Sequence, residues 1–588
     1  MTVLHLGPRS IAVTLLVLAV SAPLCRAQQP PDSGTTQQQP EPQIRQLPQT
    51  GAPTIDTRKF RRAFIGANVN VMPSAFTFSG NTLISDSELR ECIKGWLGKL
   101  TDINGLGDAA AKLRELYAAR GYVLTDVYFP EQSFSAAGGT VEFAVVEARV
   151  GKVTVTVADG SGVSEAYATS LANTYLARGE LISQEMLDKP VLLLRDMVRT
   201  DAAALVGPGD EPGEANISIS VTPRGPRFRP TLAVDNMGVI SGGAYRASAG
   251  AAVEAPFTLG DELSMRTQWA NREGNKLFGV NYGLALGRFG SKVGASFTRS
   301  DYALGRQFAT LKAFGQASVA SLSVLHPLVR SRFTNLFVSA SIDNKDLQDD
   351  IRQFRSSTDK HIALARFSVL GNHSDRALAG GTTSFALAGS AGRLHLDIES
   401  ARNDRSSGTN ANGGFYKLNA ELQRVQYLKI DSQQAWLRDF MNRSSILIGF
   451  NGQYASKNLT SAEKMNLGGP QGVRGYPIGE GVGDVGALFL LEYRYLMPLP
   501  VFGQPLTIKA FYDHGWVRRD RDPPAAQRVQ SSLENSITLN SAGIGTLVGR
   551  EGSFVLTAEL AARLGGSKPT TGDPDSAARL IMMMQYWF

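Results

Sequence analysis

In the C-terminal part of the chain, residues 225–588, apolar and polar side chains alternate in segments of about ten residues, separated by Gly, Asn, Asp and Ser. This alternation predicts a transmembrane antiparallel β-barrel of about 16 strands, whose successive side chains face lipid and lumen. A large soluble β-sandwich would also alternate, but it has no need of a terminal aromatic strand. The clearest segments are Glu262–Trp269, Phe278–Leu286, Leu336–Ile342, Ile362–Leu370, Ser445–Tyr454, Leu488–Met497, Thr507–Trp516 and Phe554–Leu564.

The last segment of the chain places large apolar side chains on one face. We expect that face to meet lipid, and Gln585 to point into the lumen. The chain ends on Tyr586, Trp587 and Phe588, which we interpret as a C-terminal signal for membrane insertion. The apolar face consists of Leu580, Met582, Met584, Tyr586 and Phe588.

Upstream, residues 69–149 combine strand-like alternation with helical spacing, which predicts a small α+β module. Ser85-x-x-Glu88 has the pattern of a capping box before one helix, and Gly121 ends a second helix, predicted over Asp108–Arg120. The order is strand, helix, helix, strand, strand. The three predicted strands are Phe76–Asn81, Tyr122–Phe129 and Thr140–Glu147.

Residues 150–224 repeat the same order of elements and predict a second module. Pro190 is expected in the first turn of a helix, where its missing N–H is not needed. The predicted elements are a strand at Val153–Val157, helices at Glu165–Ala177 and Leu187–Met197, and a strand at Asn216–Val221.

The N-terminus predicts export from the cytoplasm. Residues 1–27 have the pattern of a secretory signal peptide, with Arg9 before an apolar stretch at Ile11–Val20. Residues 28–68 are rich in Gln and Pro, and we expect a disordered or extended linker. Removal of the signal would leave Cys92 as the sole cysteine, so we expect no internal disulfide.

Composition narrows the classes of function. The chain has 588 residues, of which 43% are hydrophobic and 19% charged, and its formal net charge is +7. After the N-terminal segment, no run of about 18 consecutive apolar residues occurs, which excludes helical membrane spans. Basic residues are scattered among acidic ones, which argues against a nucleic-acid partner.

A long polar loop, residues 456–485, interrupts the barrel pattern and contains the glycine-rich stretch Leu467-Gly-Gly-Pro-Gln-Gly-Val-Arg-Gly-Tyr476. The loop is long enough to fold back into a barrel. Gly472 and Gly475, which flank its arginine, would let the backbone pass close to the wall.

Strand phase places two carboxylates on the lumen face. Asp513 alternates in phase with Lys509 and Phe511, and Glu492 faces the same way on its own strand. A carboxylate facing lipid costs a few kcal/mol at most depths, so both should face the lumen. We predict a forked, charge-assisted contact from Arg474 to Asp513, with Glu492 as a second partner.

On these residues the chain resembles the two-partner secretion transporters, outer-membrane proteins that export and activate haemolysins and filamentous adhesins. Val473, Arg474, Gly475 and Tyr476 match the inward-folded loop motif of that superfamily, and its partner strand motif is matched by Phe511, Asp513 and Gly515. The two modules are similar to polypeptide-transport-associated (POTRA) domains. The resemblance implies periplasmic modules and a barrel in the outer membrane of a Gram-negative bacterium. The family's N-terminal plug helix has no clear counterpart in the Gln/Pro-rich segment.

The resemblance also implies a function. The protein would capture an unfolded, haemolysin- or adhesin-like partner in the periplasm and export it, without a cofactor. Further expected partners are periplasmic and membrane chaperone or insertion machinery and outer-membrane lipid. The alternative is an assembly factor that inserts other barrels into the outer membrane; a passive porin with accessory domains is a weaker candidate.

An enzyme is not expected. The histidines outside the signal peptide show no metal-ligand spacing, and no Gly-x-Ser-x-Gly elbow occurs between a strand and a helix. Residues 481–486 match G-x-G-x-x-G, but a predicted barrel strand follows where a dinucleotide site needs a helix. The histidines are His326, His361, His373, His395 and His514.

Overall fold

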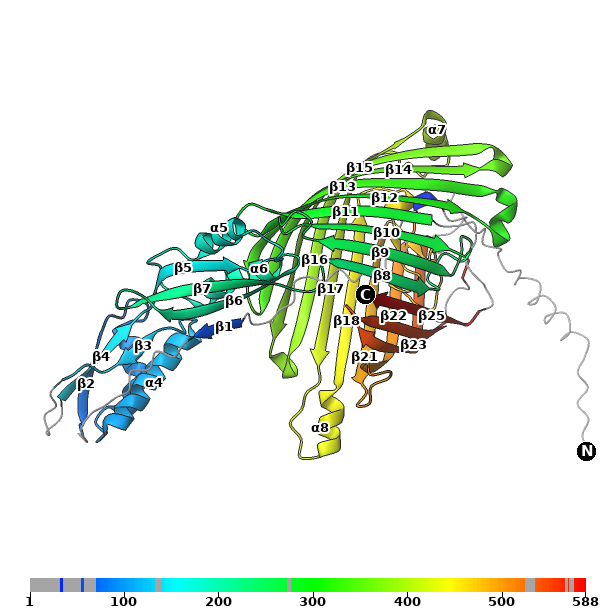
Figure 1. Ribbon diagram of the computed structural model, residues 1–588. Helices are drawn as coiled ribbons and strands as arrows, with labels where there is room; N and C mark the ends of the chain where they lie inside the picture. The colour runs from blue at the N-terminus through cyan, green and yellow to red at the C-terminus, as the bar shows by residue number, and fades with distance from the viewer. Residues whose placement is uncertain are drawn as a thin grey trace, which may run out of the picture.

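Figure 1 shows two small α+β modules that lead into a large β-barrel. The computed structural model describes residues 32–34, 54–57, 70–132, 139–271, 276–523, 535–565, 569–570 and 576–588. The predicted signal peptide, and the predicted linker apart from residues 32–34 and 54–57, lie outside the described residues.

The first module has the predicted order of elements, and its three-stranded sheet has the strand order β2-β4-β3. Leu89, Leu113 and Tyr117 are fully buried between its helices and sheet. The elements are β2 (Pro73–Ser79), α3 (Asp86–Ile93), η1 (Lys94–Trp96), α4 (Ile103–Ala119), β3 (Asp126–Tyr128) and β4 (Gly139–Val146).

Two local predictions for this module were wrong. Helix α4 begins at Ile103 rather than Asp108, because the Asp102 carboxylate accepts a hydrogen bond from the Gly105 N–H at 2.8 Å and caps the helix earlier. Ser85 precedes α3 as predicted, but its side chain makes no capping hydrogen bond.

The second module also follows the predicted order, and one unpredicted strand joins its sheet. Strand β1 (Thr54–Thr57), within the predicted linker, pairs in parallel with β6. The strand order is therefore β1-β6-β7-β5. The module's own elements are β5 (Arg149–Val157), α5 (Glu165–Tyr175), α6 (Gln184–Arg195), β6 (Thr200–Pro208) and β7 (Glu214–Pro223).

Pro190 lies inside helix α6 and not in its first turn, which corrects the prediction. The helix begins earlier than its apolar period indicates, because the Ser183 hydroxyl accepts a hydrogen bond from the Met186 N–H at 3.1 Å. The buried position of Pro190 places this side chain in the core of the module.

Sixteen antiparallel strands of the described chain form a closed barrel, in which β25 returns to pair with β8. This confirms the predicted fold class. The strands are β8 (Phe228–Asp235), β9 (Arg246–Glu254), β10 (Glu262–Ala270), β11 (Lys276–Leu286), β12 (Ser291–Ala303), β13 (Ala313–Arg330), β14 (Thr334–Ile351), β15 (Ser356–Asp375), β16 (Gly381–Leu396), β17 (Gly413–Tyr427), β18 (Ser444–Ala455), β21 (Val485–Leu496), β22 (Leu506–Arg518), β23 (Ser536–Arg550), β24 (Phe554–Arg563) and β25 (Ala578–Trp587).

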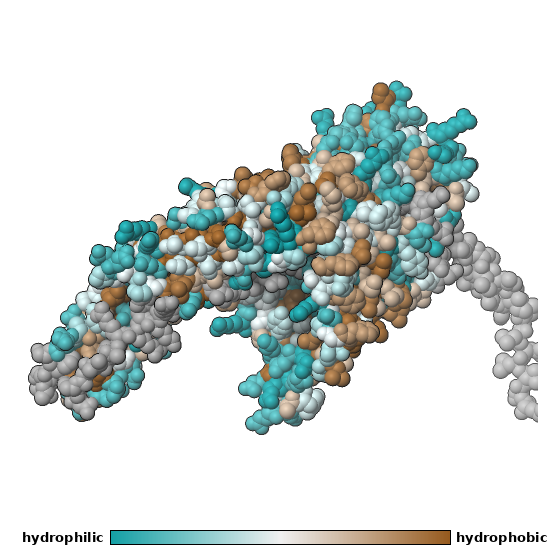
Figure 2. Space-filling model, viewed as in Figure 1, coloured by the Kyte–Doolittle hydropathy of each residue, from teal (hydrophilic) through white to brown (hydrophobic). Residues whose placement is uncertain are grey.

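Side chains alternate across the barrel wall, and apolar residues gather on its outer face (Figure 2). On β25, Leu580 and Met582 are exposed outward at 54% and 43%, whereas Gln585 is buried in the lumen. Strands β14 and β15 are longer than the predicted segments, with 18 and 20 residues. Their additional residues carry outward polar side chains such as Asp346 and His361, which apolar alternation alone does not reveal.

Connections between strands reach out at both ends of the barrel. Helix α8 (Ala435–Asn442) lies in a turn at the end where the modules attach, and α7 (Ile398–Ser406) lies at the opposite end (Figure 1). Short 3-10 turns complete the connections: η2 (Arg306–Leu311), η3 (Arg352–Phe354) and η4 (Ala377–Ala379).

None of the helices in the described part of the chain combines the length and the apolar character that a membrane span requires.

The second module docks on the rim of the barrel through helix α6. Arg330 makes a forked contact with Asp196, with N–O distances of 2.7 and 2.8 Å. Arg332 contacts Asp188 in the same way, at 2.5 and 2.9 Å. These pairs join the module to the turn between β13 and β14.

Candidate functional site in the barrel lumen

The loop between β18 and β21 folds back into the barrel and carries its own short structure. Strands β19 (Met465–Asn466) and β20 (Val482–Gly483) pair, and η5 (Ser461–Glu463) precedes them. The Val473 N–H donates to the Leu467 carbonyl at 2.7 Å, which closes a tight turn at the tip. Val473 and Tyr476 are fully buried. The tip is therefore packed against the protein and not exposed to solvent.

Arg474 at the loop tip contacts both carboxylates that strand phase placed in the lumen. Its guanidinium donates to the two oxygens of Asp513, from Nε at 3.0 Å and from Nη2 at 2.7 Å. Nη1 donates to Glu492 at 2.8 Å. The backbone N–H of Arg474 also donates to Asp513, at 3.0 Å. Arg474 thus fixes the position and direction of the loop tip on the wall.

The wall strand β22 is shaped to receive the loop. The guanidinium of Arg474 stacks on Phe511, with its carbon 3.4 Å from the ring centroid. A Cβ at Gly515 would lie 3.0 Å from a methyl of Val473 and 2.9 Å from one of Leu467. Phe511, Asp513 and Gly515 lie two positions apart on one face of β22. Phe511 stacks on the guanidinium, Asp513 supplies its charged partner, and Gly515 leaves room for the side chains of the loop.

Of the two loop glycines expected to let the backbone approach the wall, Gly475 has that role and Gly472 does not. A Cβ at Gly475 would lie 2.8 Å from the Ser541 Cβ of the wall, so this glycine does allow a close approach. At Gly472 the obstructing atom is the Leu467 carbonyl oxygen, 1.9 Å away and within the loop itself. Gly472 therefore permits the turn and not the contact with the wall, which corrects the prediction.

Tyr476, the last residue of the loop motif, is held by the neighbouring strands β24 and β25. Its hydroxyl donates to the Gly565 carbonyl at 3.2 Å. Its own carbonyl accepts a hydrogen bond from the guanidinium of Arg579. The loop motif thus touches the wall on both sides of Arg474.

Sequence reasoning missed two residues of this site, Ser541 and Glu559. The Ser541 hydroxyl donates to Asp513 at 2.9 Å. Glu559 lies 3.5 Å from Arg474 and forms an ion pair with Lys509. Lys509 had been placed on the lumen face by phase, but its partner could be identified only from the order of strands around the barrel.

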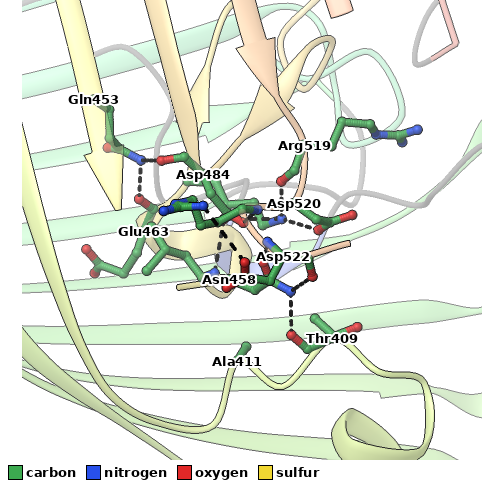
Figure 3. Close-up of polar contacts among 12 residues, drawn as sticks. Thr409, Ala411, Gln453, Asn458, Glu463, Asp484, Arg519, Asp520 and Asp522 are labelled. Atoms are coloured by element: carbon green, nitrogen blue, oxygen red, sulfur yellow. Dashed lines mark hydrogen bonds and ion pairs between the residues drawn. The ribbon is translucent and has the colours of Figure 1, made fainter. Parts of the chain in front are cut away.

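The base of the loop is fixed by polar contacts to neighbouring connections (Figure 3). The side chain of Asn458 exchanges hydrogen bonds with the backbone of Asp522 at 2.7 and 2.8 Å, and it donates to the Thr409 carbonyl at 2.6 Å. Asp484 is fully buried and accepts from the Arg521 N–H at 2.8 Å. Three connections are therefore tied together where the loop enters the barrel.

Glu463 forms a second charged anchor in the same region. Its carboxylate lies 2.7 Å from both Lys345 and Lys417, which belong to β14 and β17. Gln453 donates to the carbonyls of Glu463 at 3.1 Å and Asp484 at 3.3 Å (Figure 3). The loop base thus contacts β14 and β17, whereas the loop tip contacts β21 and β22 through Arg474.

A short piece of the predicted linker also lies against the inner wall. The Asp32 carboxylate is 2.9 Å from Lys360 and accepts a hydrogen bond from Ser461 of the loop. The Ser33 N–H donates to Asp349 at 2.7 Å. No clear counterpart of a plug helix was expected in this segment, whereas the structure places Asp32 and Ser33 between the wall and the loop.

The C-terminal residues lie away from this site. Tyr586 and Phe588 are exposed on the outer face and contact each other edge to face, with ring centroids 4.7 Å apart. The Trp587 N–H donates to the Ser553 carbonyl at 2.8 Å, and β25 closes the barrel here against β8. Within the described chain, no group of His, Cys, Asp and Glu has the arrangement of a metal site.

Comparisons with known proteins agree with this architecture. The heme/hemopexin transporter protein HuxB of Haemophilus influenzae (strain 86-028NP) is 26% identical over 508 residues, which are 86% of this chain and 84% of the relative. The outer membrane transporter CdiB of Escherichia coli O6:K15:H31 (strain 536 / UPEC) is 22% identical over 463 residues, 77% of this chain and 73% of the relative.

Solved structures show the same fold. CdiB from Escherichia coli has a TM-score of 0.64 at 18% identity and covers 100% of both chains. BamA from Haemophilus ducreyi, lacking POTRA domains 1–3, has a TM-score of 0.52 at 12% identity, covering 88% of this chain and 100% of that chain.

Family models match both parts of the chain. A ShlB-type POTRA domain model matches residues 72–148, the first module. The model of the haemolysin secretion/activation protein ShlB/FhaC/HecB matches residues 213–545, more than half of the chain. The protein therefore belongs to the haemolysin secretion/activation family ShlB/FhaC/HecB.

Proposed function

We propose that this protein captures a large secreted partner, haemolysin- or adhesin-like, in the periplasm and passes it through the barrel in an extended form. As a member of its family, it is an outer-membrane transporter with periplasmic POTRA domains. The observation that carries the proposal is the loop tip in the lumen, held by Arg474 against Asp513 and Glu492. Such a clamp in the export path can hold a transport-competent loop and release it.

The modules offer sheet edges to an extended client. In the first module, β3 pairs with β4 and forms one edge of the described sheet. An extended segment can add to such an edge through backbone hydrogen bonds, without strict demands on its sequence. In the second module, β1 already occupies the edge of β6, which shows that this sheet accepts an added strand. Chaperones that keep the client unfolded, and lipid around the barrel, complete the expected partners.

Direction would come from the client. The G-x-G-x-x-G match at residues 481–486 is followed by strand β21 and not by the helix that a dinucleotide site needs, and the periplasm supplies no ATP. A client that folds outside the cell cannot slip back through the barrel, so its folding would draw the remaining chain outward.

The role of Arg474 is tested by Arg474→Ala. Removing one partner of a buried ion pair costs about 3–5 kcal/mol, so the loop tip should leave its position. We expect normal amounts of the variant in the outer membrane and export reduced by roughly tenfold or more. Arg494→Ala is the matched control, because Arg494 contacts the same Glu492 at 2.7 Å but is not part of the loop. Unchanged export in Arg474→Ala would remove the proposed role.

Export itself is tested by comparing secreted and outer-membrane proteins with and without the gene. Loss of one large protein from the medium, with membrane composition unchanged, is expected. Broad loss of barrels from the membrane would instead identify an assembly factor, the alternative favoured by the likeness to BamA. The exported protein should also be tested for binding of hemopexin, because relatives at 26–27% identity are named heme/hemopexin transporters.

A further inference from the structure

A wide apolar groove crosses the outer face of the barrel over strands β13 to β17. Two adjoining hollows of about 980 and 920 Å³ form it, and they share five lining residues. Each volume is near the upper end of the range of roughly 300–1,000 Å³ that is usual for small-molecule sites. The shared residues are Leu322, Ile342, Ala365, Ala391 and Tyr416.

The groove follows from side-chain size along one row of the sheet. Ile342 pairs with Ala365, Ala365 with Ala391, and Ala391 with Tyr416. Ile342 and Tyr416 are 58% and 69% exposed and stand as rims about 14 Å apart, three strand spacings. The two alanines between them form a low floor. Large apolar side chains cover most of the outer face, so this floor is a local hollow in the lipid-facing band.

The floor continues along the strands in both directions. In the row toward the periplasm, Gly389 of β16 lies opposite Leu418. In the row toward the outside, Ala363 lies beside Arg393, and Arg393 beside Gly414. Phe367 of β15 pairs with Gly389 and is 57% exposed, so the groove is an oblique channel. It runs from Gly389 of β16 across the Ala365 and Ala391 floor to Ala363 of β15, with an apolar end and one cationic end.

Arg393 stands at the extracellular end of the groove. Strand β16 starts at the end of the barrel near the modules and ends at Leu396, so Arg393 is close to the outer rim. Its side chain is exposed, and within the described residues its guanidinium has no hydrogen-bond or ion-pair partner. The next row outward is polar, with His361 opposite His395. This change from apolar to polar side chains marks the head-group level of the outer leaflet.

We propose that this groove binds lipopolysaccharide of the outer leaflet. An acyl chain of its lipid A would lie on the Ala365 and Ala391 floor, and Arg393 would bind a lipid A phosphate. A guanidinium matches two phosphate oxygens at once, and an unpaired one beside an apolar channel suits a phosphorylated acyl lipid. The outer leaflet is where such a head group meets Arg393. A second copy of this chain fits poorly, because a symmetric contact would bring two unpaired arginines together.

The test uses the full-length protein in nanodiscs that contain phosphatidylglycerol and a lipopolysaccharide with short sugars and two phosphates. Native mass spectrometry after release counts the bound lipids. Arg393→Gln removes the charge without altering packing, and Ala391→Trp fills the floor. Arg438→Gln, on α8 at the periplasmic end, and Leu580→Trp, on an exposed lipid-facing position of β25, are the matched controls.

We expect the wild type and both controls to retain lipopolysaccharide, and both groove variants to retain about tenfold less. Lipopolysaccharide without phosphates should bind to the wild type as weakly as the intact lipid binds to Arg393→Gln. Equal retention by wild type and Arg393→Gln would overturn the proposal, whatever the behaviour of Ala391→Trp. Equal retention of phosphatidylglycerol by the wild type, or a dimer that Ala391→Trp dissociates, would also overturn it.

Discussion

The barrel binds two other parts of the chain, the lumen loop and the second module, through arginine–carboxylate contacts. The barrel supplies the carboxylate in one contact and the arginine in the other. In the lumen, the loop supplies Arg474 and the wall supplies Asp513, 2.7 Å away. At the periplasmic rim, the wall supplies Arg330 and the second module supplies Asp196, also at 2.7 Å. In both places a planar guanidinium binds both oxygens of a carboxylate, so each contact fixes orientation as well as distance.

The surroundings of the two contacts differ. The side chains of Arg474 and Asp513 are 7% and 0% exposed. The tip that they hold also belongs to a buried apolar cluster, which joins Leu467, Val473 and Tyr476 of the loop to Leu488, Val517 and Leu539 of the wall. At the rim, Arg330 and Asp196 are 3% and 11% exposed, the neighbouring Arg332 is 26% exposed, and Leu193 packs on Gly290 beside the charged pairs. Both contacts therefore combine charge with packing, but the lumen contact has one arginine, whereas the rim contact has two. This difference suits a loop that is held or released and a module that stays attached.

The largest effect is expected from Asp513→Asn, which tests whether the charged contact holds the loop tip. The change leaves the Arg474 guanidinium buried with only part of its compensating charge, at a cost of about 3–5 kcal/mol. We expect hydrogen exchange in residues 467–478 to accelerate by more than a hundredfold, roughly the factor that this energy implies. Exchange in the strands around Asp513 should change little. The measurement is hydrogen–deuterium exchange of the full-length protein.

The control for this change is Asp520→Asn. Asp520 contacts Lys464 at 3.0 Å at the base of the loop, so it carries a charge near the same segment but away from the tip. The tip should keep wild-type exchange in this variant. Equal protection of the tip in Asp513→Asn and in the wild type would mean that the clamp does not hold the loop, and the contrast with the rim would fail.

At the rim, Arg330→Ala should have a smaller effect. It removes the forked contact to Asp196 and a 2.9 Å hydrogen bond to Asn335, but the apolar contacts of α6 remain. We expect a loss of about 2–3 kcal/mol in docking. Spin labels at Asn173→Cys and Phe502→Cys, in a chain with Cys92→Ser, would report a broader distance distribution between module and barrel.

Arg376→Ala is the control for the rim. Arg376 lies in another turn at the same end of the barrel and makes no contact with the second module within the described residues. An unchanged distance distribution in Arg330→Ala would show that packing alone holds the module. The contact at the rim would then depend on packing and not on charge.

The contact in the lumen could be predicted from the sequence, whereas the contact at the rim could not, because its two partners lie far apart along the chain. Strand phase alone put Asp513 and Glu492 in the lumen, because a charged side chain in a ten-residue alternating segment can face only one way. The loop motif then supplied Arg474. Arg330 and Asp196 are separated by 134 residues and belong to no local pattern, so only the fold brings them together.

Local caps explain the remaining errors. Helices α4 and α6 begin earlier than their apolar period indicates, because Asp102 and Ser183 accept backbone hydrogen bonds outside that period. The strand at Thr54–Thr57 is visible only through its partner β6, since its own sequence is short and polar. Order of elements and number of strands follow from periodicity, whereas pairing between distant elements does not.

A smaller effect on the lumen side is expected from Gly515→Ala. The new Cβ would meet the ends of the Leu467 and Val473 side chains at 2.9–3.1 Å, and these can shift. We expect the loop tip to lose about 1–2 kcal/mol and its exchange to accelerate by roughly tenfold. Gly389→Ala is the control, because a Cβ there meets nothing within 4 Å. Unaltered exchange in Gly515→Ala would show that the tip is held by charge without close packing.

The smallest expected effect is that of ionic strength, which should weaken the contact at the rim but not the contact in the lumen. Raising ionic strength from about 0.1 to about 1 M shortens the screening length from roughly 10 to 3 Å, which weakens exposed pairs far more than buried ones. Arg332 at the rim is 26% exposed, so we expect module docking to lose up to about 1 kcal/mol, seen as broader spin-label distances. Arg474 and Asp513 are shielded from solvent, so exchange at the loop tip should stay constant. If the tip loosens with salt as much as the rim does, water reaches the clamp, and burial does not distinguish the Arg474 contact from the partly exposed Arg332 contact at the rim.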